Sequence, residues 1–171
     1  MATHDAEFAI HPQTRIGHIH LTVADLQRSL AFYRDLLGFA VTMWAGDSAV
    51  FLSAGSYHHH IGLNTWAGKG ASPPPSGHTG LYHFAILYPD RYQLAKTLRR
   101  LLDAHYPVQG TSDHGVSEAI YLADPDGNGV ELSVDRPQES WPCDADGPLK
   151  MGGRRSLDIN SLLAVLDQEE S

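Results

Sequence analysis

The sequence predicts an α+β fold made of two tandem βαβββ modules, and three observations lead to it. Short apolar runs with strand periodicity alternate with two amphipathic helical segments. The same order of elements occurs on both sides of a segment rich in glycine and proline. Matching residues recur at a fixed offset, since His18 and His83, like Asp25 and Asp90, are 65 positions apart. Such an offset is the mark of an internal repeat, so we expect two curved half-sheets that close on a shared cleft.

The first module, residues 15–66, is expected to open with a strand at residues 16–23. Asp25 then offers an N-cap, and Gly38 a C-terminal stop, for an amphipathic helix of about three turns. Three short strands are expected after this helix, at residues 39–44, 49–53 and 58–64. The module therefore has the order β-α-β-β-β.

The second module, residues 80–137, follows a linker at residues 67–79 that contains three consecutive prolines. Asp90 opens a second helix, whose leucines recur at helical spacing. The strands expected around this helix are residues 81–87, a short strand near residue 108, residues 119–123 and residues 130–134. The order of elements in the first module is thus repeated.

A turn sequence joins the last two expected strands. Residues 124–129, DPDGNG, preset or permit turn dihedrals and lie between two apolar runs, so the segment predicts a β-hairpin. Glu131 then lies within a strand, on the face opposite Val130 and Leu132. A carboxylate on an enclosed face needs a cation or strong hydrogen-bond donors as partners.

The alignment of the two modules supplies candidate partners for this carboxylate. It sets His18 against His83 and Gly62 against Glu131, and equivalent positions of two closing half-sheets would face the shared cleft. Two imidazoles and one carboxylate from three strands form a 2-His-1-carboxylate set, which leaves about three coordination positions open and typically holds non-haem Fe(II). Mn(II) is the alternative metal for these ligands, and Gly62 adds no ligand.

Composition limits the classes of partner. At 171 residues with 42% apolar content, the chain suits one domain that can fold unaided. A net charge of -8 argues against nucleic acid or an anionic membrane as a general partner. No signal peptide is visible, and no apolar run approaches the roughly 20 residues that span a bilayer. The single cysteine, Cys143, excludes an intramolecular disulfide and fits a cytoplasmic location.

The two flanks of the repeat are expected to differ from it. Residues 1–14 show no period and are expected to form an arm. Residues 138–171 form a C-terminal extension with a short helix over residues 157–166, which Ser156 or Asp158 could cap. Such a short helix needs tertiary contacts, so it either docks on the domain surface or on a second subunit, or covers the mouth of the cleft.

Two sequences carry a family resemblance. HIHLTVADLQRSLAFY, residues 18–33, and DPDGNGVEL, residues 124–132, resemble the vicinal oxygen chelate superfamily, which contains glyoxalase I, bleomycin-resistance proteins and type I extradiol dioxygenases. The resemblance covers residues 15–137 and implies a curved half-barrel around a metal cleft. Glyoxalase I enzymes carry a metal-binding carboxylate where this chain has Gly62, so the chain is most similar to small catechol-2,3-dioxygenase-like proteins. It has two modules where well-known ring-cleaving enzymes have four.

The resemblance also implies roles for three further residues. His59 matches a histidine that handles protons at the bound oxygen. Tyr121, ten residues before Glu131, and His114 match residues that hydrogen-bond the substrate and help to deprotonate a catechol hydroxyl. The implied reaction is meta-cleavage of a small aromatic substrate by O2, with both catechol oxygens on Fe(II). A homodimer is expected, because two-module members often dimerise.

Other readings of these residues stay open. His58, His59 and His60 could form a solvated edge strand, and His59 would need a bulge to point into the cleft. His114 could belong to a loop turn, and His20 could support His18 or lie on the surface. Two other functions are possible on this fold: a glyoxalase-like metal-dependent lyase or isomerase, and a metal-free protein that binds a small molecule. The metal-type ligands on separate strands count against the metal-free protein.

Overall fold

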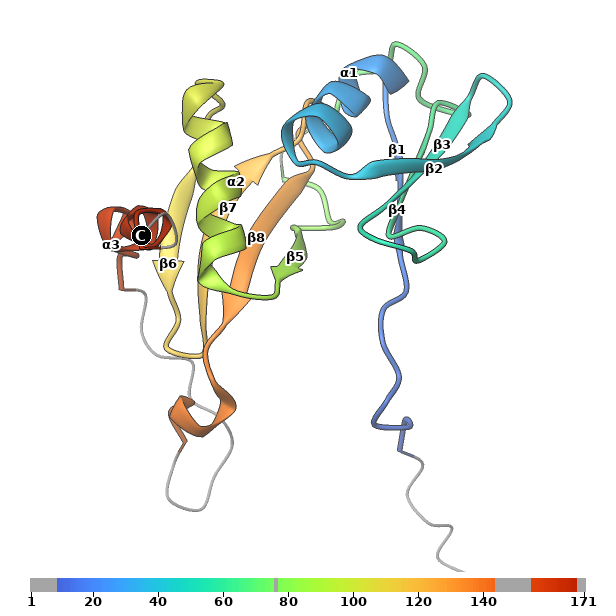
Figure 1. Ribbon diagram of the computed structural model, residues 1–171. Helices are drawn as coiled ribbons and strands as arrows, with labels where there is room; N and C mark the ends of the chain where they lie inside the picture. The colour runs from blue at the N-terminus through green and yellow to red at the C-terminus, as the bar shows by residue number, and fades with distance from the viewer. Residues whose placement is uncertain (1–8, 76, 144–154, 169–171) are drawn as a thin grey trace, which may run out of the picture.

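The computed structural model describes residues 9–75, 77–143 and 155–168 and contains two four-stranded mixed sheets (Figure 1). The first sheet has the order β1-β4-β3-β2 and the second has the order β5-β8-β7-β6. In each, the first strand runs parallel to the fourth and the other pairings are antiparallel. The predicted fold class is confirmed. The strands are β1 (Ile19–Thr22), β2 (Ala40–Ala45), β3 (Ala49–Ser53), β4 (Ile61–Asn64), β5 (Phe84–Tyr88), β6 (Gly110–Asp113), β7 (Ser117–Ala123) and β8 (Gly129–Asp135).

Each sheet has one principal helix, which begins after the predicted aspartate cap. The Asp25 carboxylate accepts a hydrogen bond from the Arg28 backbone N–H at 2.8 Å, and Asp90 accepts one from the Gln93 N–H at 2.8 Å. Gly38 ends the first helix with a φ of 89°, a conformation that glycine adopts without steric cost. The helices are α1 (Leu26–Leu30), which continues as the π-helix η1 (Ala31–Leu36), and α2 (Arg91–Asp103).

Several strands are shorter than predicted, and this changes where the histidines lie. His18 and His83 each come immediately before the first strand of their sheet. The strand predicted for residues 58–64 begins only at Ile61, so the prediction that the three preceding histidines belong to it is wrong. They lie in a loop, where the Thr42 hydroxyl donates to the His58 carbonyl oxygen at 2.8 Å. Because the strand begins after them, alternation does not fix their directions and no bulge is needed.

One hydrophobic core extends through both modules. A buried hydrogen bond between Tyr33 and Asp124, which we call the joint between the modules, also connects them. The core includes Leu30 and Leu63 of the first module and Leu98 of the second, all fully buried. The buried hydroxyl of Tyr33, in the helix that follows Leu30, donates to the carboxylate of Asp124, in the turn between β7 and β8, at 2.8 Å. Burial, and then the charge of Asp124, raises the pKa of Tyr33, so this phenol stays protonated and remains a donor.

The tail packs on the outside of the second sheet. Its helices are α3 (Ile159–Leu163) and η3 (Ala164–Leu166), while η2 (Gln138–Ser140) follows β8. Asp158 caps α3 by accepting from the Ser161 N–H at 3.0 Å, and Leu162 is fully buried where α3 packs on α2. Of the two alternatives for α3, docking on the domain surface agrees with the structure, because α3 packs on α2, which covers the sheet face opposite Glu131. Residues 144–154 and 169–171 of the predicted C-terminal extension lie outside the described residues.

None of the helices in the described parts of the chain is both long and apolar enough to cross a membrane.

Candidate active site

The second sheet holds four of the six predicted site residues in one group. The Nε2 atom of His83 lies 2.9 Å from Oε2 of Glu131, whose side chain is 13% exposed. Val130 and Leu132 on either side of Glu131 are buried in the core, so the carboxylate faces away from α2 as predicted. Tyr121 stands directly opposite Glu131 in the β7–β8 pairing, and its ring centroid lies 5.8 Å from that of His83. The ten-residue spacing of tyrosine and glutamate is therefore a cross-strand contact.

His114 extends this group through Tyr121. Its Nε2 atom lies 2.8 Å from the Tyr121 hydroxyl oxygen, whereas its Nδ1 atom is buried and has no hydrogen-bond partner among the described residues. The donor and acceptor roles in this contact depend on the His114 tautomer: when Nε2 carries no proton, it accepts the hydrogen bond from the Tyr121 hydroxyl. The pair can therefore pass a proton between an imidazole and a phenol.

The first sheet holds the other two predicted residues. The rings of His18 and His59 lie 4.5 Å apart between centroids. The Nδ1 atoms of His58 and His59 are 2.7 Å apart, so one of the two must carry a proton for them to share a hydrogen bond. Partial burial, and then the charge that His18 would carry, lower the pKa of His59 below its ordinary value. His59 is therefore biased towards its neutral form, which can accept a proton.

The ring of His20 leaves no space for a side chain at position 62. His20 and Gly62 are paired in the β1–β4 register, and a Cβ atom at Gly62 would lie 2.9 Å from Cγ of His20. The His20 ring also contacts Phe51 and Trp66, with centroid distances of 5.6 Å and 5.4 Å. A carboxylate side chain at position 62 would displace His20. The sequence pattern did not single out Phe51 or Trp66, because no motif or periodicity marks them.

Gly129 permits the contact between His83 and Glu131. A Cβ atom at this position would lie 2.2 Å from the backbone oxygen of Tyr82, which cannot move aside as a flexible side chain would. The absence of a side chain lets β8 approach the segment that leads into β5. Sequence reasoning read Gly129 only as a turn residue, because this close approach depends on tertiary structure.

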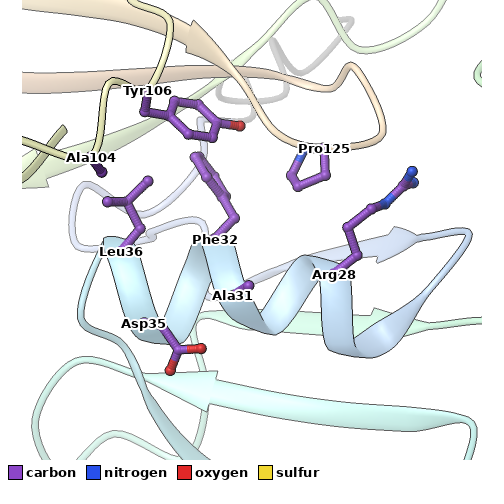
Figure 2. A pocket seen from close by; sticks show the side chains of 8 residues that line it. All are labelled: Arg28, Ala31, Phe32, Asp35, Leu36, Ala104, Tyr106 and Pro125. Carbon is purple, nitrogen blue, oxygen red and sulfur yellow. The ribbon is translucent and has the colours of Figure 1, made fainter. Parts of the chain in front are cut away.

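The two groups of site residues do not meet within one chain. Among the described residues, no three histidine, cysteine, aspartate or glutamate side chains converge to hold a metal ion. A hollow of about 440 Å³ lies at the junction of the two modules, between α1 and the β7–β8 turn. Figure 2 shows the side chains that line it, among them Arg28, Phe32 and Tyr106. Neither this hollow nor a second one of about 760 Å³ beside Trp44 and Lys69 is lined by a predicted site residue.

A family model and curated relatives match most of this chain. The model for the Glyoxalase/Bleomycin resistance protein/Dioxygenase superfamily matches residues 15–132. A catechol-2,3-dioxygenase of Bacillus subtilis (strain 168) is 43% identical over 161 residues, which are 94% of this chain and 55% of that protein. A biphenyl-2,3-diol 1,2-dioxygenase 3 of Rhodococcus globerulus is 31% identical over 74% of this chain and 67% of its own length. The chain thus spans about half the length of the Bacillus relative.

Solved structures share the fold at low sequence identity. A glyoxalase/dioxygenase from Nostoc punctiforme superimposes with a TM-score of 0.62 and 19% identity, over 78% of this chain and 100% of that one. A lactoylglutathione lyase from Agrobacterium tumefaciens gives a TM-score of 0.56 and 23% identity, over 72% and 96% of the two chains. At these identities the likeness concerns the fold alone.

Proposed function

We propose, since this chain belongs to the Glyoxalase/Bleomycin resistance protein/Dioxygenase superfamily, that it is an extradiol dioxygenase that cleaves a catechol-type ring with O2. The observation that carries the proposal is the group on the second sheet, where the His83–Glu131 pair lies beside the hydrogen-bonded Tyr121 and His114. Ring cleavage requires ligands for a metal ion and, beside them, groups that transfer protons. His83 and Glu131 are of the first kind, and Tyr121 and His114 are of the second. The names of the Bacillus and Rhodococcus relatives support this class of substrate.

The proposed metal ligands are His18, His83 and Glu131, and one chain brings only two of them together. His83 and Glu131 have donor atoms 2.9 Å apart, a separation at which both can contact one ion. His18 lies on the other sheet, beside His59. The donors would suit Fe(II), with Mn(II) as the alternative. Among the described residues of the single chain the set is therefore incomplete.

Tyr121 and His114 have the proposed role of managing the protons of the substrate. A catechol must lose its hydroxyl protons to react, and a neutral imidazole that accepts a hydrogen bond from a phenol can take up a proton from it. The 2.8 Å contact between the two side chains gives that transfer a path. His59, biased towards its neutral form, would accept or return a proton at the opposite side of the substrate.

The glycine at position 62 argues against a glyoxalase-like isomerase, because it has no side chain that could bind a metal ion. Such an enzyme needs a fourth protein ligand there, and the ring of His20 occupies the space that a side chain on Gly62 would enter. A metal-free binding protein is disfavoured because it has no need to place the metal-type ligands His18, His83 and Glu131 on or just before separate strands. The dioxygenase accounts for both observations.

The test is anaerobic loading with Fe(II), followed by addition of O2 and a panel of substituted catechols. We expect oxygen uptake together with yellow ring-cleavage products. A Glu131→Gln variant, which keeps the size of the side chain and removes its charge, is expected to lose the metal and both signals. Isomerisation of a thiol adduct of methylglyoxal with Ni(II) or Zn(II), without oxygen uptake on any catechol, would instead establish the glyoxalase-like function.

A further inference from the structure

We propose that Arg136 and Asp113 are positioning residues: they hold the turn that carries His114, so that its imidazole meets the Tyr121 hydroxyl. The inference rests on the proposed function, because it concerns the two side chains proposed to manage the protons of the substrate. It goes further by assigning the geometry of that pair to an ion pair between residues that sequence reasoning does not place in the site.

The His114 ring forms a hydrogen bond through only one of its nitrogen atoms among the described residues. Its Nε2 atom meets the Tyr121 hydroxyl at 2.8 Å, and its Nδ1 atom is buried without a partner there. Histidines that transfer protons are commonly oriented by a hydrogen bond at their other ring nitrogen. No described group does this for His114, so the direction of its ring depends on the backbone that carries it.

That backbone is the short turn between β6 and β7, residues 114–116. The His114 N–H donates to the Ser117 carbonyl oxygen at 2.9 Å, and Gly115 has a φ of 78°, which glycine adopts without steric cost. Asp113 supports the turn, because its Oδ1 atom accepts from the Gly115 N–H at 2.9 Å. The second carboxylate oxygen of Asp113 is then available to a partner outside the turn.

Arg136 is that partner, and it contacts the turn with both its side chain and its backbone. Its Nη2 atom donates to Oδ2 of Asp113 at 2.9 Å. Its backbone N–H, directly after the end of β8, donates to the Val116 carbonyl oxygen at 2.8 Å. The turn is therefore held on both sides of His114, at the residue before it and at the second residue after it.

The buried Glu118 keeps the guanidinium of Arg136 in place. Its side chain is 5% exposed, and it accepts from Arg136 at 2.9 Å and from Arg91 at 2.8 Å. A buried carboxylate that loses a guanidinium partner is costly, so the Arg136 side chain stays between Glu118 and Asp113. Among the described ion pairs, Asp113 is paired with Arg136 and not with Arg91.

The experiment compares two matched variants, Arg136→Met and Arg91→Met. Each removes one guanidinium from Glu118, and the two arginine side chains are similarly exposed, at 37% and 38%. Only Arg136→Met also removes a partner of Asp113. A difference between the variants therefore reports on the turn, because a general loss of stability appears in both.

The first readout needs no metal and is amide hydrogen exchange of the full-length variants, followed by NMR. The backbone N–H groups of His114 and Gly115 are expected to exchange on the order of 10-fold faster in Arg136→Met than in its control, because the turn opens more easily. The N–H of the buried Ile120, in the middle of β7, is the internal reference and should exchange alike in both. Equal exchange at the turn in the two variants would overturn the positioning role.

The second readout is turnover after loading with Fe(II). Arg136→Met should lower kcat about 10-fold, because a misplaced imidazole transfers protons less efficiently, while Arg91→Met should stay near the wild type. In a His114→Ala background, Arg136→Met should cause no further loss, since no ring is left to position. An equal loss in both backgrounds would overturn the positioning role and leave the proposed function standing. A wild-type protein that cleaves no catechol would overturn the proposed function, whereas the exchange comparison would still decide whether Arg136 holds the turn.

Discussion

Strand register decides which residues of this site can act together. Tyr121 and Glu131 face each other across β7 and β8, and His114 reaches Tyr121 from the loop before β7. Two glycines support the arrangement at positions where a Cβ atom would be too close: Gly62 under the ring of His20, and Gly129 against the backbone before His83. The chemistry proposed for the site thus depends on small residues that take no part in it.

At this scale we predict the effect of removing one hydroxyl group. Tyr121→Phe should retain Fe(II) content but lower ring-cleavage turnover on the order of 100-fold, because the proposed proton pair loses one member. Tyr106→Phe is the control, since the Tyr106 hydroxyl donates to the Ala123 carbonyl oxygen at 2.7 Å, outside the proposed site. Steady-state kinetics with parallel metal analysis provide the measurement. Unchanged turnover in Tyr121→Phe would remove the residue from the mechanism.

At the scale of the elements, charged side chains at one end of the second sheet form a network of ion pairs. Glu118 on β7 is buried and pairs with Arg91 and Arg136 at 2.8 Å and 2.9 Å. Arg136 also pairs with Asp113 on β6 at 2.9 Å, so a single guanidinium links two strands. Sequence periodicity did not reveal this network, because its members are far apart in the chain.

This network predicts how the stability of the folded protein depends on pH in the acid range. Burial alone would raise the pKa of Asp113, but the hydrogen bonds from the Gly115 N–H and Arg136 outweigh it, and the pKa lies below its ordinary value. A carboxylate with a lower pKa in the folded state stabilises the protein above its unfolded pKa of about 3.9, and this stabilisation is lost as the pH falls through the folded value. Asp113→Asn should therefore lower the free energy of unfolding by about 1 kcal/mol at pH 7.

The measurement is urea denaturation of both proteins from pH 7 downwards. The difference between wild type and Asp113→Asn should shrink as the carboxylate of the wild type becomes protonated. Asp35→Asn serves as the control, because Asp35 is exposed and its carboxylate pairs only with the neighbouring Arg34 among the described contacts. A difference that stays constant with pH would show that the charge of Asp113 does not contribute.

At the scale of the whole molecule, the contacts between the two modules contribute to the stability of the fold and also hold the two sheets that carry the site residues. One hydrophobic core and the Tyr33–Asp124 hydrogen bond connect the two modules, with the His18–His59 group on the first sheet and the His83–Glu131 group on the second. Tyr33→Phe should lower the free energy of unfolding by about 1 to 3 kcal/mol, because Asp124, which is 4% exposed, loses its phenol donor. Thermal denaturation should show a single transition shifted down by several degrees.

The control for this prediction is Tyr92→Phe, because the Tyr92 ring lies on the surface of α2 under the ammonium group of Lys96. Its melting temperature should stay close to that of the wild type. Two separate transitions in the wild type, neither of them affected by Tyr33→Phe, would show that the modules fold independently and that the joint is not a structural link.

The sequence by itself determined the duplication, the two aspartate caps, the hairpin around DPDGNG and the direction of the Glu131 side chain, which points away from the core. Each of these depends on local dihedral preferences or on periodicity, which a chain carries in its own residues. Tertiary structure decided that residues 58–60 form a loop, that α3 packs on α2, and that no three metal-type side chains of the described residues converge. These features depend on contacts between distant segments. The Tyr33–Asp124 bond, for example, joins residues 91 positions apart, which no local pattern encodes.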